Sequence, residues 1–84
     1  MYNVGIIGIG FLGGSLARSF SKSQKVKDIV AFDKNLNSLK SAYYDGVITD
    51  YTNKINEKFS NCDIIFICTP VSYIAEYALE LKNM

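Results

Sequence analysis

The chain has 84 residues, which is enough for one small domain and well short of a two-domain enzyme. Nine lysines and arginines against eight aspartates and glutamates leave a net charge of +1, and no basic stripe is long enough to follow a phosphate backbone, so nucleic acid is not an expected partner. No apolar run reaches the ~18 residues of a membrane span, and the N-terminus lacks the charged leader of a signal peptide. A cytoplasmic domain that does not enter the membrane is therefore expected.

Strand and helix patterns alternate along the chain, without a linker, repeat or low-complexity stretch. The first strand is expected over residues 3–7, a short apolar run that ends in a glycine cluster. The helix that follows carries apolar residues at positions four apart, on a face that is expected to pack on the sheet: Leu12, Leu16 and Phe20. A second apolar run predicts a second strand over residues 29–32.

The second helix has clear start and stop signals. Asn35 is the expected N-cap, and Gly46 is the expected stop because glycine readily adopts the left-handed conformation. The residues expected to face inward are Leu36, Leu39 and Tyr43.

The region after Gly46 has weaker patterns. Val47 and Ile48 predict a short third strand. Residues 52–59 predict a weaker helix, which rests mainly on Ile55 and Phe59.

The fourth strand is expected over residues 63–68, which are nearly all apolar, as in a strand covered on both faces. Thr69 and Pro70 end this strand. A last helix is then expected to place four apolar residues on one side, namely Val71, Ile74, Ala78 and Leu81.

The two cysteines, Cys62 and Cys68, are expected to be free thiols. Six positions of extended strand place them about 20 Å apart at ~3.3 Å per residue, which is beyond the reach of a disulfide. Free thiols fit a reduced cytoplasmic compartment, and because the chain has no histidine, no metal site is expected.

Strands joined by crossover helices require a parallel sheet with right-handed connections. The expected fold class is therefore α/β, a partial Rossmann-type doubly wound sheet with strand order 3-2-1-4 and helices on both faces. The chain ends at Met84, where a fifth strand would begin. The expected organisation is one incomplete N-terminal dinucleotide-binding domain over residues 1–84.

The segment between the first strand and the first helix matches the pattern G-x-G-x-x-G: Gly8-Ile9-Gly10-Phe11-Leu12-Gly13. Gly8 permits a tight turn, Gly10 lets the backbone approach a pyrophosphate, and Gly13 lets the helix lie close to the strand. The backbone amides of Phe11 and Leu12 are expected to point at phosphate oxygens from the helix N-terminus. The alternative is an ordinary strand-to-helix turn without a ligand.

Asp33 ends the second strand, twenty residues after Gly13, where a carboxylate can accept hydrogen bonds from the adenosine ribose hydroxyls. It would also repel the 2′-phosphate of NADP, so NAD is the expected cofactor. Lys34 is a neighbouring cation that could offset part of this repulsion. Without a ligand, Asp33 would serve only as a helix-capping carboxylate.

The segment Cys68-Thr69-Pro70-Val71 follows the fourth strand, beside the point where ligands bind in open α/β sheets. It is expected either to contact the cofactor or merely to start a helix, with Thr69 or Ser72 as its cap. Ser15 either reaches a phosphate or bonds to backbone. Four tyrosines are expected to be core and surface aromatics and not site residues, namely Tyr43, Tyr44, Tyr73 and Tyr77.

The opening of the chain resembles that of the prephenate dehydrogenases: Val4-Gly5-Ile6-Ile7-Gly8-Ile9-Gly10-Phe11-Leu12-Gly13-Gly14-Ser15-Leu16-Ala17. Further matches keep the same register over nearly the whole chain: Asp33-Lys34-Asn35, Asp45-Gly46-Val47-Ile48, and Cys62-Asp63 running to Thr69-Pro70-Val71. The resemblance implies oxidative decarboxylation of prephenate to 4-hydroxyphenylpyruvate with NAD, in tyrosine biosynthesis. It also implies that the glycine loop, Asp33 and the segment from Thr69 to Val71 contact the cofactor.

In that family a histidine assisted by a serine accepts the proton of the substrate hydroxyl, arginines hold the substrate carboxylates, and a helical domain binds substrate and forms a homodimer. The resemblance places these parts beyond Met84, so the 84-residue chain alone is expected to be inactive. One alternative is a β-hydroxyacid dehydrogenase or pyrroline-5-carboxylate reductase, against which Gly14-Ser15-Leu16 argues. The others are a non-catalytic module that senses the NAD/NADH ratio and a gene remnant.

Overall fold

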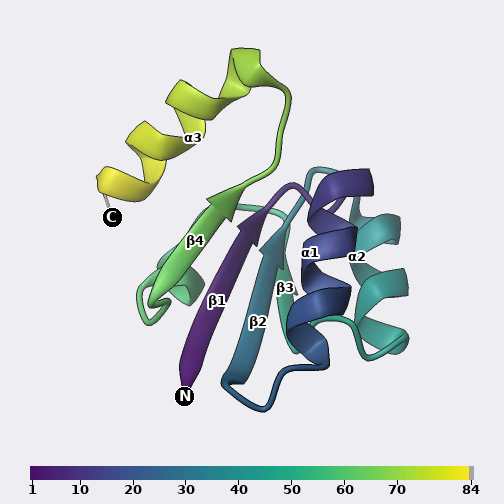
Figure 1. Cartoon of the computed structure of the whole chain (residues 1–84). Coiled ribbons are helices and arrows are strands. Elements are labelled where there is room, and N and C mark those ends of the chain that lie inside the picture. The colour runs from purple at the N-terminus through teal and green to yellow at the C-terminus, as the bar shows by residue number, and fades with distance from the viewer. Residues whose placement is uncertain (84) are drawn as a thin grey trace.

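The structure is a computed structural model that describes residues 1–83; Met84 and the side chain of Val71 lie outside the described part. The elements in chain order are β1 (Tyr2–Ile7), α1 (Phe11–Ser21), β2 (Val26–Phe32), α2 (Leu36–Tyr44), β3 (Asp50–Thr52), the short 3-10 helix η1 (Glu57–Phe59), β4 (Ile64–Ile67) and α3 (Val71–Lys82) (Figure 1). Among residues 1–83, no helix combines the length and the apolar character needed to cross a membrane.

The four strands form one parallel sheet in the order β3-β2-β1-β4. This confirms the α/β fold of Rossmann type and its predicted strand order. In Figure 1, α1 and α2 lie together on one side of the sheet, and α3 lies apart from them, beyond β4. The carboxyl ends of β1, β2 and β4 therefore meet at one edge of the sheet, between the helices.

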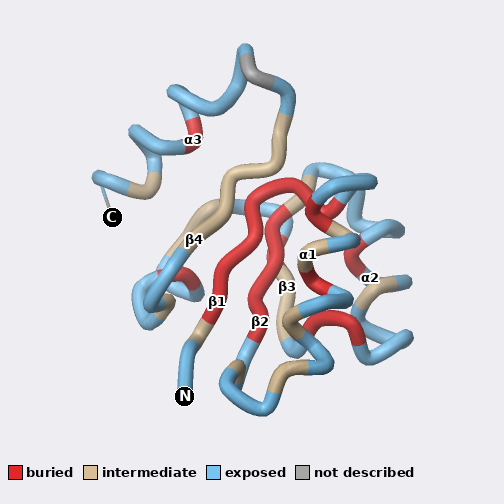
Figure 2. Tube along the Cα trace, viewed as in Figure 1, coloured by how far each residue is buried: buried red, intermediate tan, exposed pale blue. Residues whose placement is uncertain are grey.

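The sheet buries different residues on its two faces because side chains alternate along a strand. Ile6 of β1 packs with Ala17 of α1 and Leu39 of α2. Ile7, the next residue, packs on the opposite face with Phe59 of η1 and Tyr77 of α3. Figure 2 shows the buried residues concentrated along β1 and β2, so the core follows the two central strands.

The face of α1 that meets the sheet differs from the prediction. Leu12 is 62% exposed, whereas Gly13 and Ala17 are buried. Leu16 and Phe20 lie at the margin of the core, partly buried. Small residues at the contact let the helix lie close to the sheet, which turns Leu12 outward.

The predicted boundaries of α2 are confirmed. The Asn35 side chain accepts hydrogen bonds from two backbone N–H groups of the first turn, at 3.1 and 3.2 Å. Gly46 follows the helix with a φ of +75°, the left-handed conformation that ends it. Leu39 is fully buried, as expected.

The prediction that Leu36 and Tyr43 face inward is wrong. They are 38% and 44% exposed. Tyr43 instead packs against Tyr51 of the edge strand β3, with the two rings in a T-shaped arrangement at a centroid distance of 5.3 Å. Leu39 is therefore the residue through which α2 enters the core.

The third strand lies slightly later than predicted. Val47 and Ile48 are buried, but they precede β3. The Val47 N–H donates to the Ala42 carbonyl at 2.9 Å, so Val47 completes the helix stop and does not pair with β2. These apolar side chains therefore anchor the connection between α2 and β3.

The helix predicted over residues 52–59 is wrong, because only Glu57–Phe59 are helical, as η1. Polar side chains capture the backbone locally instead. The Thr52 hydroxyl donates to the Lys54 carbonyl at 2.9 Å, and Asn56 caps η1 by accepting a backbone N–H at 3.0 Å. Phe59 is nevertheless buried, so the apolar signal marked a core residue and not a helix.

The fourth strand is shorter than predicted and is not covered on both faces. Among the residues that the structure describes, β4 is an edge strand whose pairing partner is β1, and Ile64 is 48% exposed. Cys62 precedes it and Cys68 follows it, and both are free thiols, as expected.

The helix after β4 is confirmed, but it is turned about its axis relative to the prediction. Ile74 and Ala78 are exposed, while Tyr77 is 6% exposed and Leu81 is partly buried. The prediction for the Val71 side chain lies outside the described residues. Among the described side chains of α3, Tyr77 and Leu81, which are four residues apart, form the stripe through which the helix meets the sheet.

Candidate functional site

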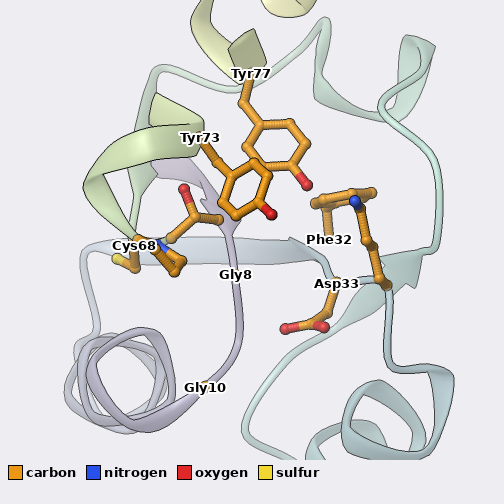
Figure 3. Close-up of a pocket in the computed structure, with 10 residues that line it drawn as sticks. Gly8, Gly10, Phe32, Asp33, Cys68, Tyr73 and Tyr77 are labelled. Atoms are coloured by element: carbon orange, nitrogen blue, oxygen red, sulfur yellow. The ribbon is translucent and has the colours of Figure 1, made fainter. Parts of the chain in front are cut away.

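A cleft of about 280 Å³ opens where the carboxyl ends of β1, β2 and β4 meet (Figure 3). The predicted site residues that line it are Gly8, Gly10, Asp33, Lys34, Cys68, Thr69 and Pro70. Three aromatic residues, Phe32, Tyr73 and Tyr77, complete the lining. Four predicted residues are not part of this lining, namely Ile9, Phe11, Leu12 and Gly13, and the side chain of Val71 lies outside the described residues.

The turn after β1 is held between the ends of its two neighbouring strands. The Gly8 N–H donates to the Phe32 carbonyl of β2, and the Cys68 N–H donates to the Ile7 carbonyl, each at 2.7 Å. Gly8 has a φ of +95°, and a Cβ atom there would lie 3.0 Å from the Thr69 methyl carbon. A side chain at position 8 is therefore excluded both by conformation and by space.

The other two glycines of the motif have different surroundings. A Cβ atom at Gly13 would collide with the backbone carbonyl oxygen of Gly8, so only glycine allows α1 to approach β1 this closely. A Cβ atom at Gly10 would meet no atom within 4 Å, because Gly10 faces open space at the cleft. Gly13 thus serves packing, whereas Gly10 leaves the adjoining space of the cleft open.

The N-terminus of α1 points its backbone amides toward this space. Its N-cap is Gly10, and no side chain caps the helix. The first N–H groups of a helix lack intrahelical partners and carry partial positive charge, which makes such a terminus suitable for a phosphate group. Ser15, on the exposed surface of α1, is not among the residues lining the cleft.

Asp33 links the glycine turn to the start of α2. One carboxylate oxygen accepts the Ile9 N–H at 3.0 Å, and the other accepts the Asn35 N–H at 2.8 Å. Asn35 itself is the N-cap of α2, so Asp33 is not that cap. Each carboxylate oxygen can accept a second hydrogen bond, which leaves Asp33 fixed in place and able to bind hydroxyl groups in the cleft.

Tyr73 and Tyr77 of α3 form an aromatic wall that faces Asp33 across the cleft, as Figure 3 shows. The Tyr77 ring packs edge-on against Phe32 at a centroid distance of 5.3 Å, and the Tyr73 ring lies 6.3 Å from Tyr77. Tyr77 is a core residue and Tyr73 an exposed one, as expected, and both also line the cleft. Their spacing of four residues, on the helix after β4, was the available signal.

Lys34 also reaches this wall. Its ammonium nitrogen lies 5.5 Å from the centroid of the Tyr73 ring, within the range of a cation–π interaction. The cleft is thus lined by one fixed carboxylate, at Asp33, and one ammonium group, at Lys34, that rests on the aromatic wall.

The segment after β4 supplies a hydroxyl group without a partner. The Thr69 Oγ1 atom is buried and has no hydrogen-bond partner in the described structure. The predicted side-chain cap by Thr69 or Ser72 is wrong, because Pro70 is the N-cap of α3 and no side chain caps this helix. Burial raises the pKa of the Cys68 thiol, which disfavours the thiolate and argues against a nucleophilic role.

Several solved dehydrogenase structures have the same fold. A prephenate dehydrogenase from A. aeolicus, in complex with hydroxyphenyl propionate and NAD+, is 33% identical over 99% of this chain, with a TM-score of 0.89. A myo-inositol 2-dehydrogenase from Lactobacillus plantarum is 28% identical over 98% of the chain, with a TM-score of 0.80. A scyllo-inositol dehydrogenase from Lactobacillus casei, with bound cofactor NAD(H) and scyllo-inositol, is 21% identical over 99%, with a TM-score of 0.79, and supports the fold alone.

The chain spans 29% of the length of the prephenate dehydrogenase and 25% of the length of each inositol dehydrogenase. A family model described as NADP oxidoreductase coenzyme F420-dependent matches residues 3–84. The predicted oxidoreductase class and nicotinamide cofactor are confirmed at this general level. The chain therefore belongs to the family described as NADP oxidoreductase, coenzyme F420-dependent, and it is an NAD(P)-binding domain of the dehydrogenase type with a Rossmann fold.

Proposed function

We propose that this chain is the NAD-binding domain of a prephenate dehydrogenase. The observation that carries the cofactor assignment is Asp33, whose carboxylate is fixed at the end of β2 by two backbone N–H groups and lines the cleft. A carboxylate in this position accepts the ribose hydroxyls of NAD and repels the 2′-phosphate of NADP. The substrate assignment is supported by 33% identity to a prephenate dehydrogenase whose structure contains NAD+.

Two further features fit a bound dinucleotide. The open space at Gly10, which any side chain would enter, can hold a pyrophosphate against the N-terminal amides of α1. The buried Thr69 hydroxyl has no hydrogen-bond partner among the described residues, and a group of the ligand could supply one. We therefore assign cofactor contact to the glycine loop Gly8-Ile9-Gly10-Phe11-Leu12-Gly13, to Asp33 and Lys34, and to Cys68-Thr69-Pro70-Val71.

When bound, NAD supplies the hydride acceptor for the oxidation. The residues of this chain bind and orient it. The chain contains no histidine, the side chain whose ordinary pKa best suits proton transfer near neutral pH. In the proposed reaction, the proton of the substrate hydroxyl is thus taken by a part of the protein outside these 84 residues, which we also propose to form a homodimer.

The cofactor assignment is tested by titrating the 84-residue chain with NADH and with NADPH, following nucleotide fluorescence. NADH is expected to bind more tightly. Asp33→Asn should weaken NADH binding about 10-fold or more, because hydrogen bonds to a charged group contribute ~1.5–3 kcal/mol. Asp45→Asn, which removes an exposed carboxylate outside the cleft, is the matched control. Tighter binding of NADPH than of NADH would contradict the assignment.

The substrate assignment is tested with the native protein that carries this domain. Addition of prephenate and NAD is expected to give NADH and 4-hydroxyphenylpyruvate, whereas the 84-residue chain alone should bind NADH without this turnover. The 28% identity to a myo-inositol 2-dehydrogenase favours a cyclic polyol as the second candidate substrate. Turnover of myo-inositol without turnover of prephenate would decide for that candidate.

A further inference from the structure

The two charged residues among those described as lining the cleft are neighbours in sequence and opposite in sign: Asp33 and Lys34. Asp33 is fixed by its hydrogen bonds to the backbone of Ile9 and Asn35. Lys34 is exposed and has a long flexible side chain, so the position of its charge is set by what it rests on. A phosphate on the 2′-oxygen of the ribose would be repelled by the carboxylate and attracted by a free ammonium group beside it.

The Lys34 ammonium group rests on the ring of Tyr73, at 5.5 Å from the ring centroid. Tyr73 comes from α3 and Lys34 from the loop between β2 and α2, so the contact joins the two walls of the cleft. The ring is supported by Tyr77, 6.3 Å away, and Tyr77 is buried against Phe32. The aromatic surface that holds the lysine is therefore anchored in the core.

We propose that Tyr73 is a specificity-determining residue, which strengthens the preference for NAD over NADP by holding the Lys34 charge on its ring and away from the 2′ position. Tyr73 acts through Lys34 and is thus a positioning residue. The inference rests on the proposed binding of NAD in this cleft. It explains how a domain with a lysine next to Asp33 can still exclude a phosphorylated ribose.

The test is the ratio of the Kd values for NADPH and NADH, measured with the 84-residue chain at one fixed low ionic strength. Tyr73→Leu keeps the bulk of the side chain and removes the aromatic face. It should tighten NADPH binding relative to NADH by about two- to fivefold, the effect expected from losing an exposed cation–π contact. Tyr73→Phe keeps the aromatic face and should restore the wild-type ratio.

A second pair of variants shows whether the effect passes through the lysine. In a Lys34→Ala background, where there is no charge to release, Tyr73→Leu should leave the ratio unchanged. Lys40→Ala, which removes an exposed cation from α2 outside the cleft, is the control for net charge. Lys34→Ala alters an exposed side chain and is expected to fold.

Two results would overturn the inference: an equal change of the ratio with and without Lys34, or an unchanged ratio in Tyr73→Leu, as when both nucleotides are weakened equally. Equal weakening would mean that the ring only contacts the part that NADH and NADPH share. Failure of the wild-type chain to bind NADH would instead contradict the proposed function. The two kinds of failure are therefore distinguishable in one titration series.

Discussion

The three glycines of the loop after β1 are similar in sequence and different in physical role. Gly8 adopts a left-handed φ of +95°, Gly13 lets α1 approach the Gly8 carbonyl, and Gly10 faces empty space at the cleft. Stability should therefore depend on Gly8 and Gly13, whereas ligand binding should depend on Gly10.

Gly13→Ala is expected to destabilise the fold by at least about 2 kcal/mol, because the added methyl group collides with backbone that cannot move aside. Gly10→Ala should cost at most about 1 kcal/mol, the difference in N-cap preference, yet abolish NADH binding by filling the space of the pyrophosphate. Urea unfolding and NADH titration of the two variants measure these effects. Normal NADH affinity in Gly10→Ala would show that the phosphates bind elsewhere.

The two thiols should react slowly. Burial raises the pKa of the Cys68 thiol, and burial together with the Asp63 carboxylate raises the pKa of the Cys62 thiol. At pH 8 the folded chain is expected to react with iodoacetamide more slowly than the urea-unfolded chain, because the thiolate is the reactive form. Mass spectrometry of the modified chain measures the two rates, and equal rates would contradict the expected pKa shifts.

The same shifts predict how stability changes with pH. Below the ordinary thiol pKa of about 8.5, both the folded and the unfolded chain keep their thiols protonated, and the full stability is present. As pH rises above this value, the unfolded chain releases protons that the folded chain retains, so the free energy of unfolding should fall. Urea unfolding at pH 7 and pH 9.5 tests this, with Cys62→Ser/Cys68→Ser as the control expected to show a smaller decrease.

At the scale of elements, few of the described side chains of α3 hold this helix against the sheet. Tyr77 is buried against Phe32, and Leu81 is partly buried on the same face of the sheet, whereas most other residues of α3 are exposed (Figure 2). By comparison, α1 and α2 each bury a residue fully in the larger cluster, Ala17 and Leu39. The helix α3, which supplies one wall of the cleft, is thus held against the sheet more weakly than α1 and α2.

Tyr77→Ala should release α3 from the sheet, because it removes the ring that packs on Phe32 and leaves a cavity; a buried aromatic residue contributes about 3 kcal/mol or more. Hydrogen exchange is expected to increase along α3 while β1 and β2 stay protected, and NADH binding should weaken. Leu79→Ala, at a position that is 58% exposed, is the control. Unchanged exchange in α3 would mean that other contacts hold this helix.

For the whole molecule, the open edge of the sheet at β4 is expected to decide whether copies of the chain associate. β4 pairs with β1 on one side, and beside it lies an apolar groove of about 400 Å³. The groove is lined by Tyr2, Val4, Phe20, Val26, Asp63, Ile64 and Phe66. An exposed edge strand with apolar surroundings is a template for pairing with another chain.

The chain is therefore expected to self-associate as its concentration rises, as measured by sedimentation velocity. Ile64→Lys places a charge on the exposed part of the edge strand and should reduce this association. Lys58→Ala, which changes charge away from the groove, is the control. A clean monomer at high concentration in the unsubstituted chain would contradict the prediction.

The sequence by itself determined the order of elements and the main features of the site. The glycine cluster, the Asn35 cap and the Gly46 stop are local signals, and each is present where it was predicted, whereas the weaker patterns between Val47 and Phe59 marked buried residues and not the predicted elements. Parallel strands joined by crossovers leave few topologies, so the strand order followed as well. Asp33 could be assigned to the cleft because the end of β2 always meets the turn after β1 in such a sheet.

The tertiary structure alone decided how each helix is turned about its axis. Leu12 and Tyr43 have the right spacing for burial but point outward, while Gly13 and Tyr77 point inward. Spacing gives the width of an apolar stripe, but its direction is fixed by contacts with residues distant in sequence. For the same reason, the spacing of Tyr73 and Tyr77 put both on one side of α3, but it did not show that this side faces the cleft or that Tyr73 contacts Lys34.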